Sequence, residues 1–169
     1  MNDVKMTQKF TFHAPSSEDG LSVYKLIKAC PPLDRNSTYC NLLQCHHFAE
    51  TSVAAKKEED LVGFVSGYLI PDKPNTLFIW QVAVAEHARG YGLATQMLQK
   101  IIDRPNNAEI TWLETTITAD NAASWALFES LARARGGMVK RTVMFDKQKH
   151  FNNEHNTEYL MRIGPLSPR

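Results

Sequence analysis

The sequence predicts an α/β (α+β) protein with one central mixed sheet, and three observations support that prediction. Strand-like and helix-like segments follow one another in the order β, α, α, then three strands, then α, β, α, β, β, which is typical of a layered fold. The three consecutive strands are separated by short turns, as in an antiparallel meander. Apolar residues make up 43% of the 169 residues, enough for one core. We therefore expect a single domain over 1–169, with its core in 7–164 and short flexible termini.

The first three elements are predicted from alternation and from helix-capping residues. Residues 8–13 alternate apolar and polar side chains, which indicates a half-buried strand. Residues 16–19 offer an N-cap and an acidic first turn, so a helix is expected to follow and to end at Pro31-Pro32. Asn36 or Ser37 is expected to cap a second helix. The side chains expected to face inward on the first helix are Leu21, Tyr24, Leu26 and Ile27. The second helix is expected to carry Tyr39, Leu42, Leu43 and Phe48.

The remaining elements are predicted from apolar runs and from the turn residues that bound them. The strands expected in the meander are 51–56, 61–70 and 77–85, and those expected later are 109–118, 138–145 and 158–163. Helices are expected over 91–103, before Pro105, and over 121–135, before Gly136-Gly137. The segment 146–157 is polar and rich in His and Asn, and a loop of that length often carries function.

Charge and composition narrow the classes of partner. The 19 basic and 18 acidic residues give a net charge of +1 without a basic stripe, so nucleic acid is not expected as a partner. No apolar run approaches the ~18 residues that span a bilayer. Residues 1–5 lack the apolar segment of a secretory signal, so a cytoplasmic protein without membrane contact is expected. Three cysteines form no CxxC pair, and the adjacent His46 and His47 would point about 100° apart on a helix, so no metal is expected.

One segment has the pattern of a phosphate-binding loop. Arg89-Gly90-Tyr91-Gly92-Leu93-Ala94 follows an apolar strand and opens a helix, whose first N–H groups and dipole favour an anion. Glycine allows the backbone to approach that anion, and Arg89 adds positive charge. The chain lacks both the Walker motif and Gly-x-Gly-x-x-Gly, which excludes those two nucleotide-binding classes. The pattern alone leaves an ordinary strand-to-helix turn as the alternative.

Two motifs resemble those of the GCN5-related N-acetyltransferases. Arg89-x-x-Gly92-x-Ala94 matches that family's Gln/Arg-x-x-Gly-x-Gly/Ala signature, and Asn121-x-x-Ser124-x-x-Leu127-Phe128 resembles its second cofactor segment. The resemblance implies acetyl-CoA as cosubstrate. It also implies a mostly antiparallel sheet flanked by helices, in which a bulge in the fourth strand splays it from the fifth. Pantetheine would then lie in the gap and bond to the backbone of Val82 and Val84. The cofactor-binding residues implied are Gln81, Val82, Ala83, Val84, Arg89, Gly90, Gly92, Leu93, Ala94, Asn121, Ser124 and Phe128.

Three longer segments resemble one branch of this family over nearly the whole chain. Residues 31–39, 78–84 and 113–124 are similar to the members that acetylate the γ-amine of L-2,4-diaminobutyrate. Those members serve the synthesis of ectoine, a compatible solute made under osmotic stress. The resemblance implies direct attack of the amine on the thioester through a tetrahedral intermediate. Arg35 departs from the pattern, where an apolar residue is expected, and this bears on substrate affinity rather than on reaction type. The alternatives are another amine acceptor and a non-catalytic acyl-CoA-binding module.

The acceptor that the resemblance implies dictates the rest of the site, because it carries two amines and one carboxylate. Asp34, in an irregular stretch before a helix, is expected to anchor an amine and to take part in catalysis. The alternative is that Asp34 or Asn36 merely caps that helix. Asn36 and Tyr39 are expected to add hydrogen bonds to the acceptor. Trp80, at the start of the cofactor-binding strand, is expected to wall the pocket, with a place in the core as the alternative.

Further expectations concern proton transfer and assembly. Glu114, a carboxylate within a β-rich stretch, is the candidate relay for the amine proton, and a salt bridge or a solvated strand face is the alternative. Glu158 is expected to hold an ammonium group, and His155 a carboxylate. A loop at the periphery reaches a pocket more easily when a second subunit supplies it, so we expect a homodimer with these two residues near the interface. Phe128 stands where many family members have a Tyr that protonates the leaving thiolate, so Tyr39, water or unaided departure must serve instead.

Overall fold

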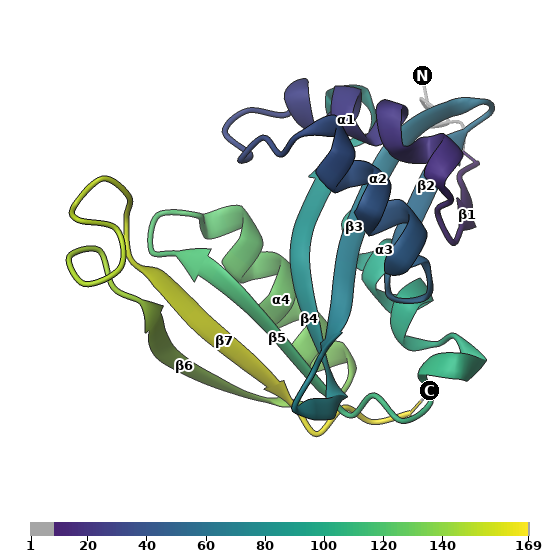
Figure 1. Cartoon of the computed structure of the whole chain (residues 1–169). Coiled ribbons are helices and arrows are strands. Elements are labelled where there is room, and N and C mark those ends of the chain that lie inside the picture. Colours follow the sequence, from purple (N-terminus) through teal and green to yellow (C-terminus); the bar gives the residue numbers. More distant parts are fainter. Residues whose placement is uncertain (1–8, 169) are drawn as a thin grey trace, which may run out of the picture.

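Seven strands form one mixed sheet in the computed structural model, which describes residues 9–168 (Figure 1). The strand order across the sheet is β1-β2-β3-β4-β5-β7-β6. The strands are β1 Thr11–His13, β2 Val53–Lys57, β3 Asp60–Ile70, β4 Lys73–Val84, β5 Trp112–Thr118, β6 Met138–Phe145 and β7 Glu158–Gly164. The helices are α1 Gly20–Lys28, α2 Thr38–His47, α3 Leu93–Ile102 and α4 Ala122–Ala134, with short 3-10 turns at Ser17–Asp19, Ala49–Thr51, Glu86–Ala88 and Pro105–Asn107.

The pairing of the strands confirms the predicted architecture. β2, β3 and β4 form the expected antiparallel meander, and β1 adds to its edge. The pair β4–β5 is parallel, whereas β5–β7 and β7–β6 are antiparallel. α1 and α2 cover one face of β3 and β4, and α3 and α4 cover the opposite face of the sheet (Figure 1). A mostly antiparallel sheet with helices on both faces is the predicted α/β (α+β) fold.

A hydrophobic core lies on each face of the sheet. The larger one packs α3 and α4 onto the strands, with Met97 and Leu131 buried in the same cluster as Leu77. The smaller one packs α1 and α2 onto the meander and includes Ile27 and Phe64. Because apolar side chains anchor helices on both faces, the strands between them are held without direct exposure to water.

β4 carries one residue more than β3 between the pairs on either side of Trp80. Ser66 lies opposite Gln81 and Gly67 lies opposite Ile79, so Trp80 has no partner on β3 and forms a bulge. The parallel pairing of β4 with β5 ends at Ile79, directly before that bulge. From there the two strands diverge, as Figure 1 shows. This geometry confirms the splayed fourth and fifth strands that the sequence resemblance implies.

Gly67 is the residue of β3 that accommodates the bulge. An added Cβ would lie 2.8 Å from the carbonyl oxygen of Thr51 and 2.9 Å from that of Phe78, both of which are backbone atoms. The Thr51 hydroxyl donates to the Gly67 carbonyl at 2.6 Å, and the Gly67 N–H donates to the Ser52 hydroxyl at 3.2 Å. Side chains of the two residues before β2 thus complete the hydrogen bonding of β3 at Gly67, and the backbone oxygens of Thr51 and Phe78 leave no room for a larger residue there.

Helix α1 faces the core with a different set of residues from the expected one. Ile27 is buried as predicted, but Leu21 is 52% exposed, and Val23 is fully buried instead. The reason is the position at which the helix starts. Gly20, Val23 and Ile27 share one face at helical spacing, and Leu21 is rotated about 100° from that face.

Helix α2 begins as predicted but presents a polar face to the sheet. Ser37, rather than Asn36, is its N-cap, because the Ser37 hydroxyl accepts the Cys40 N–H at 3.0 Å. Asn41 is completely buried, whereas Tyr39 is 70% exposed. Residues two apart on a helix point in nearly opposite directions, so burial of Asn41 turns Tyr39 towards solvent.

The segment after β7 packs back onto the helices. Leu166 is buried in the larger core, and the Ser167 N–H donates to the Arg135 carbonyl at 2.8 Å. The Arg135 guanidinium, 5% exposed, donates to the Asp103 carboxylate at 2.7 Å, which joins the ends of α3 and α4. Residues 1–8, which include the start of the predicted first strand, lie outside the described residues, and the flexibility expected of the two termini stays a prediction.

Replacing Gly67 with Ala is expected to lower the free energy of unfolding by about 1–3 kcal/mol, the usual cost of forcing extra volume into a packed site. The new Cβ would meet two backbone oxygens rather than flexible side-chain ends, so β4 has to shift at the bulge. Urea denaturation of both proteins measures the difference. Ser66→Ala is the control, because the buried Ser66 hydroxyl has no hydrogen-bond partner among the described residues and its loss should cost little. Equal stability of Gly67→Ala and wild type would contradict this packing.

Candidate active site

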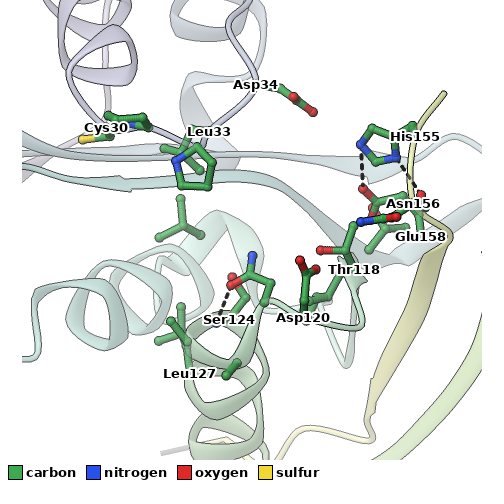
Figure 2. A pocket seen from close by; sticks show the side chains of 18 of the residues that line it. Cys30, Leu33, Asp34, Thr118, Asp120, Ser124, Leu127, His155, Asn156 and Glu158 are labelled. Atoms are coloured by element: carbon green, nitrogen blue, oxygen red, sulfur yellow. Dashed lines mark hydrogen bonds and ion pairs between the residues drawn. The ribbon is translucent and has the colours of Figure 1, made fainter.

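A cleft of about 1050 Å³ opens where β4 and β5 separate (Figure 2). Its walls come from the α1–α2 loop, β4, the loop before α3, the end of β5, the first turn of α4 and the 146–157 loop. Figure 1 shows the α1–α2 loop and the 146–157 loop at the end of the sheet where the strands diverge. Segments that are far apart in the sequence therefore meet around a single cavity.

The loop before α3 has the conformation that an anion site requires. Gly90 and Gly92 have φ angles of 86° and 70°, a region that favours glycine, and Gly92 is the N-cap of α3. α3 begins at Leu93, and Ala94 in its first turn lines the cleft. That first turn contains no acidic residue, so the helix presents its free N–H groups and the positive end of its dipole to an anion.

A second helix N-terminus opens on the same cleft. The Asn121 side chain caps α4 by accepting the Ser124 N–H at 3.2 Å, and both residues line the cleft as expected. Phe128, which was expected to bind the cofactor, is 2% exposed and belongs to the larger core, and its neighbour Leu127 lines the cleft instead. Adjacent side chains point about 100° apart on a helix, so only one of these two reaches the cavity.

Alternate residues of β4 face the cleft beyond the bulge. Val82 and Val84 line it, whereas Gln81 and Ala83 do not. The Ala85 N–H donates to a β3 carbonyl at 2.8 Å. Backbone groups alternate in direction along a strand, so those of Val82 and Val84 point away from β3 and towards the gap. Of the four β4 residues implied as cofactor ligands, the structure thus brings two to the cleft.

Two side chains hold the carbonyl of Val84. Arg89 Nε donates to it at 3.2 Å, and the thiol of Cys30 donates to it at 3.4 Å. Arg89 and Cys30 both line the cleft, and Cys30 is only 3% exposed. These contacts tie the phosphate loop and the end of α1 to the same point on β4. Cys30 was not expected among the site residues, because nothing near it in the sequence marks it as a neighbour of β4.

Four carboxylates of the described residues line the same cleft, namely Asp34, Asp120, Glu154 and Glu158. Figure 2 shows Asp34 on the α1–α2 loop across the cavity from Glu158, with Asp120 on the same side as Glu158. The side chain of Glu158 is 20% exposed. Its partial burial raises its pKa above the usual value, and the negative charge of Asp34 adds to that rise. Two of the expected acceptor-binding residues, Asp34 and Glu158, therefore line the same cleft from opposite sides.

His155 stands beside Glu158 and also lines the cleft. Its Nε2 lies 3.9 Å from the Glu158 carboxylate, and its Nδ1 lies 2.6 Å from the carbonyl oxygen of Asn156 (Figure 2). The positive charge of a protonated His155 opposes the effect of burial on the pKa of Glu158. The ring of Phe151 packs on the imidazole with the ring centres 4.5 Å apart. His155 is thus held on both sides.

The 146–157 loop is fixed by its own hydrogen bonds. The Asp146 carboxylate accepts the backbone N–H groups of Lys149 and Gln148 at 2.9 Å each, and these bonds lower the pKa of Asp146. The Lys147 N–H donates to the Thr157 hydroxyl at 3.0 Å, which closes the loop. The sequence pattern indicated a functional loop here but singled out only His155 at its end. The further cleft-lining side chains of this loop are Lys147, Asn153, Glu154 and Asn156.

Glu114 is not among the residues that line the cleft. It is 3% exposed and forms an ion pair with Lys73 at 3.3 Å. It forms a second ion pair with Arg162, the residue opposite it on β7. The guanidinium of Arg162 in turn lies over the ring of Trp112, 4.2 Å from its centre. The structure therefore supports the salt-bridge alternative for Glu114. A carboxylate held by two cations inside the sheet is not placed to take a proton from an amine in the cleft.

Three residues expected to bind the acceptor also lie outside the lining of the cleft, and so do Gly90, Gly92 and Leu93 of the phosphate loop. Asn36 donates a hydrogen bond to the side chain of Gln81 at 3.5 Å. Tyr39 points to solvent from α2. Trp80, at the bulge, is 44% exposed and packs edge-on against Tyr68 with the ring centres 6.2 Å apart. Trp80 is thus not a core residue, and contacts of these three side chains with an acceptor stay predictions.

The three cysteines are free thiols. Burial raises the pKa of Cys45 to about 12, which leaves its thiol unreactive near neutral pH. Among residues 9–168, no three His, Cys, Asp or Glu side chains are grouped so that they could hold a metal ion. No helix in the same range has the length and apolar character needed to cross a membrane.

Comparison with known proteins gives a consistent set of relatives. Residues 21–132 match the model of the acetyltransferase (GNAT) family. The L-2,4-diaminobutyric acid acetyltransferase of Methylotuvimicrobium alcaliphilum is 58% identical over 156 residues, which cover 92% of this chain and 91% of that protein. The protein of the same name from Vibrio cholerae is 53% identical over 154 residues, which cover 91% and 89%.

Solved structures are similar over almost the full length. The diaminobutyrate acetyltransferase EctA from Paenibacillus lautus, in complex with L-2,4-diaminobutyric acid and coenzyme A, superposes with a TM-score of 0.90. It is 34% identical, and the match covers 96% of this chain and 98% of that one. Ard1 from Thermoplasma volcanium superposes with a TM-score of 0.74 at 16% identity, over 95% and 99% of the two chains, and shows the shared fold alone.

Replacing Glu158 with Gln is expected to raise stability more at pH 7.5 than at pH 4. Folding raises the pKa of this carboxyl, mainly through burial. The resulting stabilisation is complete below the usual Glu pKa of ~4.3 and is lost as pH rises through the folded pKa. Above that pH, the folded protein carries a partly buried negative charge that Gln lacks. Urea denaturation at the two pH values measures the difference, with the exposed Glu154→Gln as control. A gain that does not depend on pH would contradict this account.

Proposed function

This chain belongs to the acetyltransferase (GNAT) family, and we propose that it transfers the acetyl group of acetyl-CoA to the γ-amine of L-2,4-diaminobutyrate. The observation that carries the proposal is the combination of groups that line one cleft. Two helix N-termini and the backbone of β4 line it, and so do four carboxylates, of which Asp34 and Glu158 lie across the cavity from each other (Figure 2). Relatives that share 53% and 58% of its residues carry the name of this reaction. The product, N-γ-acetyl-2,4-diaminobutyrate, would serve the synthesis of ectoine under osmotic stress.

The donor end of the cleft suits the chemistry of coenzyme A. We assign its pyrophosphate to the N-terminus of α3, where Gly90 and Gly92 give the loop its left-handed turns and Arg89 and Ala94 line the cleft. We assign the amide groups of pantetheine to the backbone of Val82 and Val84, which points into the gap between the splayed strands. The thioester then lies beside the bulge, at the junction of the two ends of the cleft.

The acceptor end suits a small molecule with two ammonium groups and one carboxylate. Asp34 and Glu158 face each other across the cavity, so each can hold one nitrogen of the acceptor (Figure 2). His155 and Lys147 are basic side chains on the 146–157 loop that line the same end, and we assign the carboxylate of the acceptor to them. Asp34 therefore keeps the anchoring role that its place in the sequence predicted.

The attacking amine must first lose a proton. An unperturbed alkyl ammonium has a pKa near ~10.4, so presenting it neutral at pH 7.4 costs about 4 kcal/mol. Partial burial raises the pKa of Glu158, which makes this carboxylate a better proton acceptor than an exposed one. We therefore assign to Glu158 the proton relay first predicted for Glu114. From Glu158 the proton passes to water at the mouth of the cleft.

The neutral amine then attacks the thioester carbon. A carbon–nitrogen bond forms, and the carbonyl oxygen takes up negative charge, which a backbone N–H of Val82 or Val84 is placed to stabilise. The carbon–sulfur bond then breaks, and coenzyme A leaves as a thiolate. The new amide nitrogen releases its extra proton to solvent, and the thiolate takes up one proton from solvent, so the step is balanced. A thiol pKa near ~8.5 makes it a fair leaving group without a phenol to protonate it. The buried Phe128 is consistent with unaided departure.

A homodimer is proposed from the exposure of β6. All eight residues of this edge strand are exposed, and the apolar ones include Met138 (73%), Val139 (46%) and Val143 (56%). An exposed apolar edge strand promotes uncontrolled pairing unless a partner covers it. β6 leads directly into the 146–157 loop, so a second copy on β6 would lie near His155 and Glu158.

We further propose that the protein acts in the cytoplasm. The free thiols of Cys30, Cys40 and Cys45 are consistent with a reducing compartment. The net charge of +1 gives no electrostatic reason to bind nucleic acid. Its partners would accordingly be its two small-molecule substrates and a second copy of itself.

Incubation with acetyl-CoA and L-2,4-diaminobutyrate should release thiol and give a monoacetylated product whose fragmentation in mass spectrometry places the acetyl group on the γ-nitrogen. Asp34→Ala should raise the KM for diaminobutyrate about tenfold or more, because it removes a charged hydrogen-bond partner. The KM for acetyl-CoA should stay nearly unchanged. Glu129→Ala, an exposed carboxylate on α4 outside the cleft, is the matched control.

Two outcomes would count against this assignment. Equal rises in both KM values for Asp34→Ala would remove Asp34 from the acceptor site. Failure to release thiol with diaminobutyrate would overturn the reaction itself. The decarboxylated analogue 1,3-diaminopropane tests recognition of the carboxylate, and it should be acetylated about tenfold less efficiently or worse.

Val143→Lys should dissociate the proposed dimer, because it places a charge among the exposed apolar residues of β6. Sedimentation velocity should show a dimer for the wild type and a monomer for the variant. Leu69→Lys, which changes an apolar residue of similar type that is 40% exposed on β3, should leave the dimer intact. A wild-type protein that is monomeric and fully active would contradict the proposed homodimer.

A further inference from the structure

We propose that Gln81 is a positioning residue of the acceptor site, which sets the place of the Asp34 carboxylate by holding the loop that carries it. The inference rests on the proposed function, because it gives Asp34 its role. The sequence resemblance implied that Gln81 binds the cofactor. In the structure, Gln81 is not among the residues that line the cleft, and its side chain is bonded to the α1–α2 loop.

Both ends of the Gln81 amide are used by that loop. Nε2 of Gln81 donates to the carbonyl oxygen of Asp34 at 2.8 Å, and Nδ2 of Asn36 donates to Oε1 of Gln81 at 3.5 Å. Gln81 is only 8% exposed, so its amide has little access to water as an alternative partner. Loss of such a buried hydrogen bond leaves a polar group unsatisfied, which is costlier than loss of an exposed one.

The loop needs this support because it has no regular structure of its own. Residues 34–37 belong to neither a helix nor a strand, and Asp34 is exposed. A free loop residue samples many backbone conformations, and fixing one residue costs about 1–2 kcal/mol of entropy. A hydrogen bond to the main chain of Asp34 itself restricts that residue directly. The carboxylate then projects into the cleft from a fixed point.

The position of Gln81 along β4 gives this contact a second consequence. Gln81 follows the bulge at Trp80 and precedes Val82, whose backbone lines the donor end of the cleft. One strand therefore bonds to the acceptor loop through a side chain and to the donor through the next residue. This arrangement fixes the spacing between the two substrates, which is the requirement for attack at short range.

Two substitutions separate the parts of the contact. Gln81→Met is similar in size and removes both hydrogen bonds. Gln81→Glu keeps an acceptor for Asn36 but cannot donate to the Asp34 carbonyl. Both should raise the KM for diaminobutyrate about tenfold or more and change the KM for acetyl-CoA less than about twofold. Where either variant fails to fold, Asn36→Ala should shift the same KM in the same direction by a smaller factor.

A double-mutant cycle distinguishes positioning from a general structural role. If Gln81 acts through Asp34, then Gln81→Met should cost about tenfold in kcat/KM for diaminobutyrate in the wild type, but less than about twofold in Asp34→Ala. Gln96→Met is the matched control, because the Gln96 amide makes the same type of bond, at 3.1 Å, to the Tyr91 carbonyl in the phosphate loop. That variant should change the KM for acetyl-CoA rather than that for diaminobutyrate.

The outcomes separate this inference from the proposed function. A wild-type enzyme that does not acetylate diaminobutyrate would overturn both. An active wild type in which Gln81→Met costs the same factor with and without Asp34 would overturn the inference alone. A rise in the KM for acetyl-CoA equal to that for diaminobutyrate would do the same, and would return Gln81 to the cofactor side.

Discussion

The single extra residue in β4 is the constraint on which the site depends. Because Trp80 has no partner on β3, the direction of β4 changes, and its pairing with β5 ends at Ile79. The backbone of Val82 and Val84 is thereby freed from a neighbouring strand and turned towards the cleft. Without the bulge, β4 and β5 would pair along their full length, and the sheet would have a continuous surface where it now has a cavity. The bulge also requires glycine at position 67 of β3, because there is no space for a side chain there.

The electrostatics of the cleft follow from the elements that meet at the splay. Two helices begin there, so their positive ends lie at one end of the cavity. The α1–α2 loop and the start of β7 contribute the carboxylates of Asp34 and Glu158 to the same cavity. A polyanionic donor and a cationic acceptor are thus drawn to opposite ends of a single cavity. The partial burial of Glu158 raises the pKa of its carboxyl, which makes the carboxylate more basic and lowers the stability of the folded protein near neutral pH. Such a shift is typical of residues at functional sites.

The sequence predicted those features that depend on local chemistry. Strand alternation, the helical stretch that starts at Asn121 and the glycines before α3 each act within a few residues, so the fold was predicted without coordinates and a phosphate-binding loop was proposed. Features that depend on contacts between residues far apart in the sequence were not predicted. Glu114 and Arg162 are 48 positions apart, and their ion pair was one of two alternatives. Gln81 bonds to a residue 47 positions away, and nothing beside it in the chain indicates that contact. Leu21 was misplaced for a smaller reason, since a helix start determines which side chains face inward.

The internal hydrogen bonding of the 146–157 loop has a consequence for evolution. The loop is closed by contacts among its own residues, such as Asp146 with Lys149 and Lys147 with Thr157. It leaves the sheet at the end of β6 and returns at the start of β7, without contributing to either hydrophobic core. Insertions and substitutions there leave the donor site intact. A lineage can therefore acquire a new amine substrate by remodelling this hairpin tip, while selection for coenzyme A binding continues to act on β4 and the starts of α3 and α4.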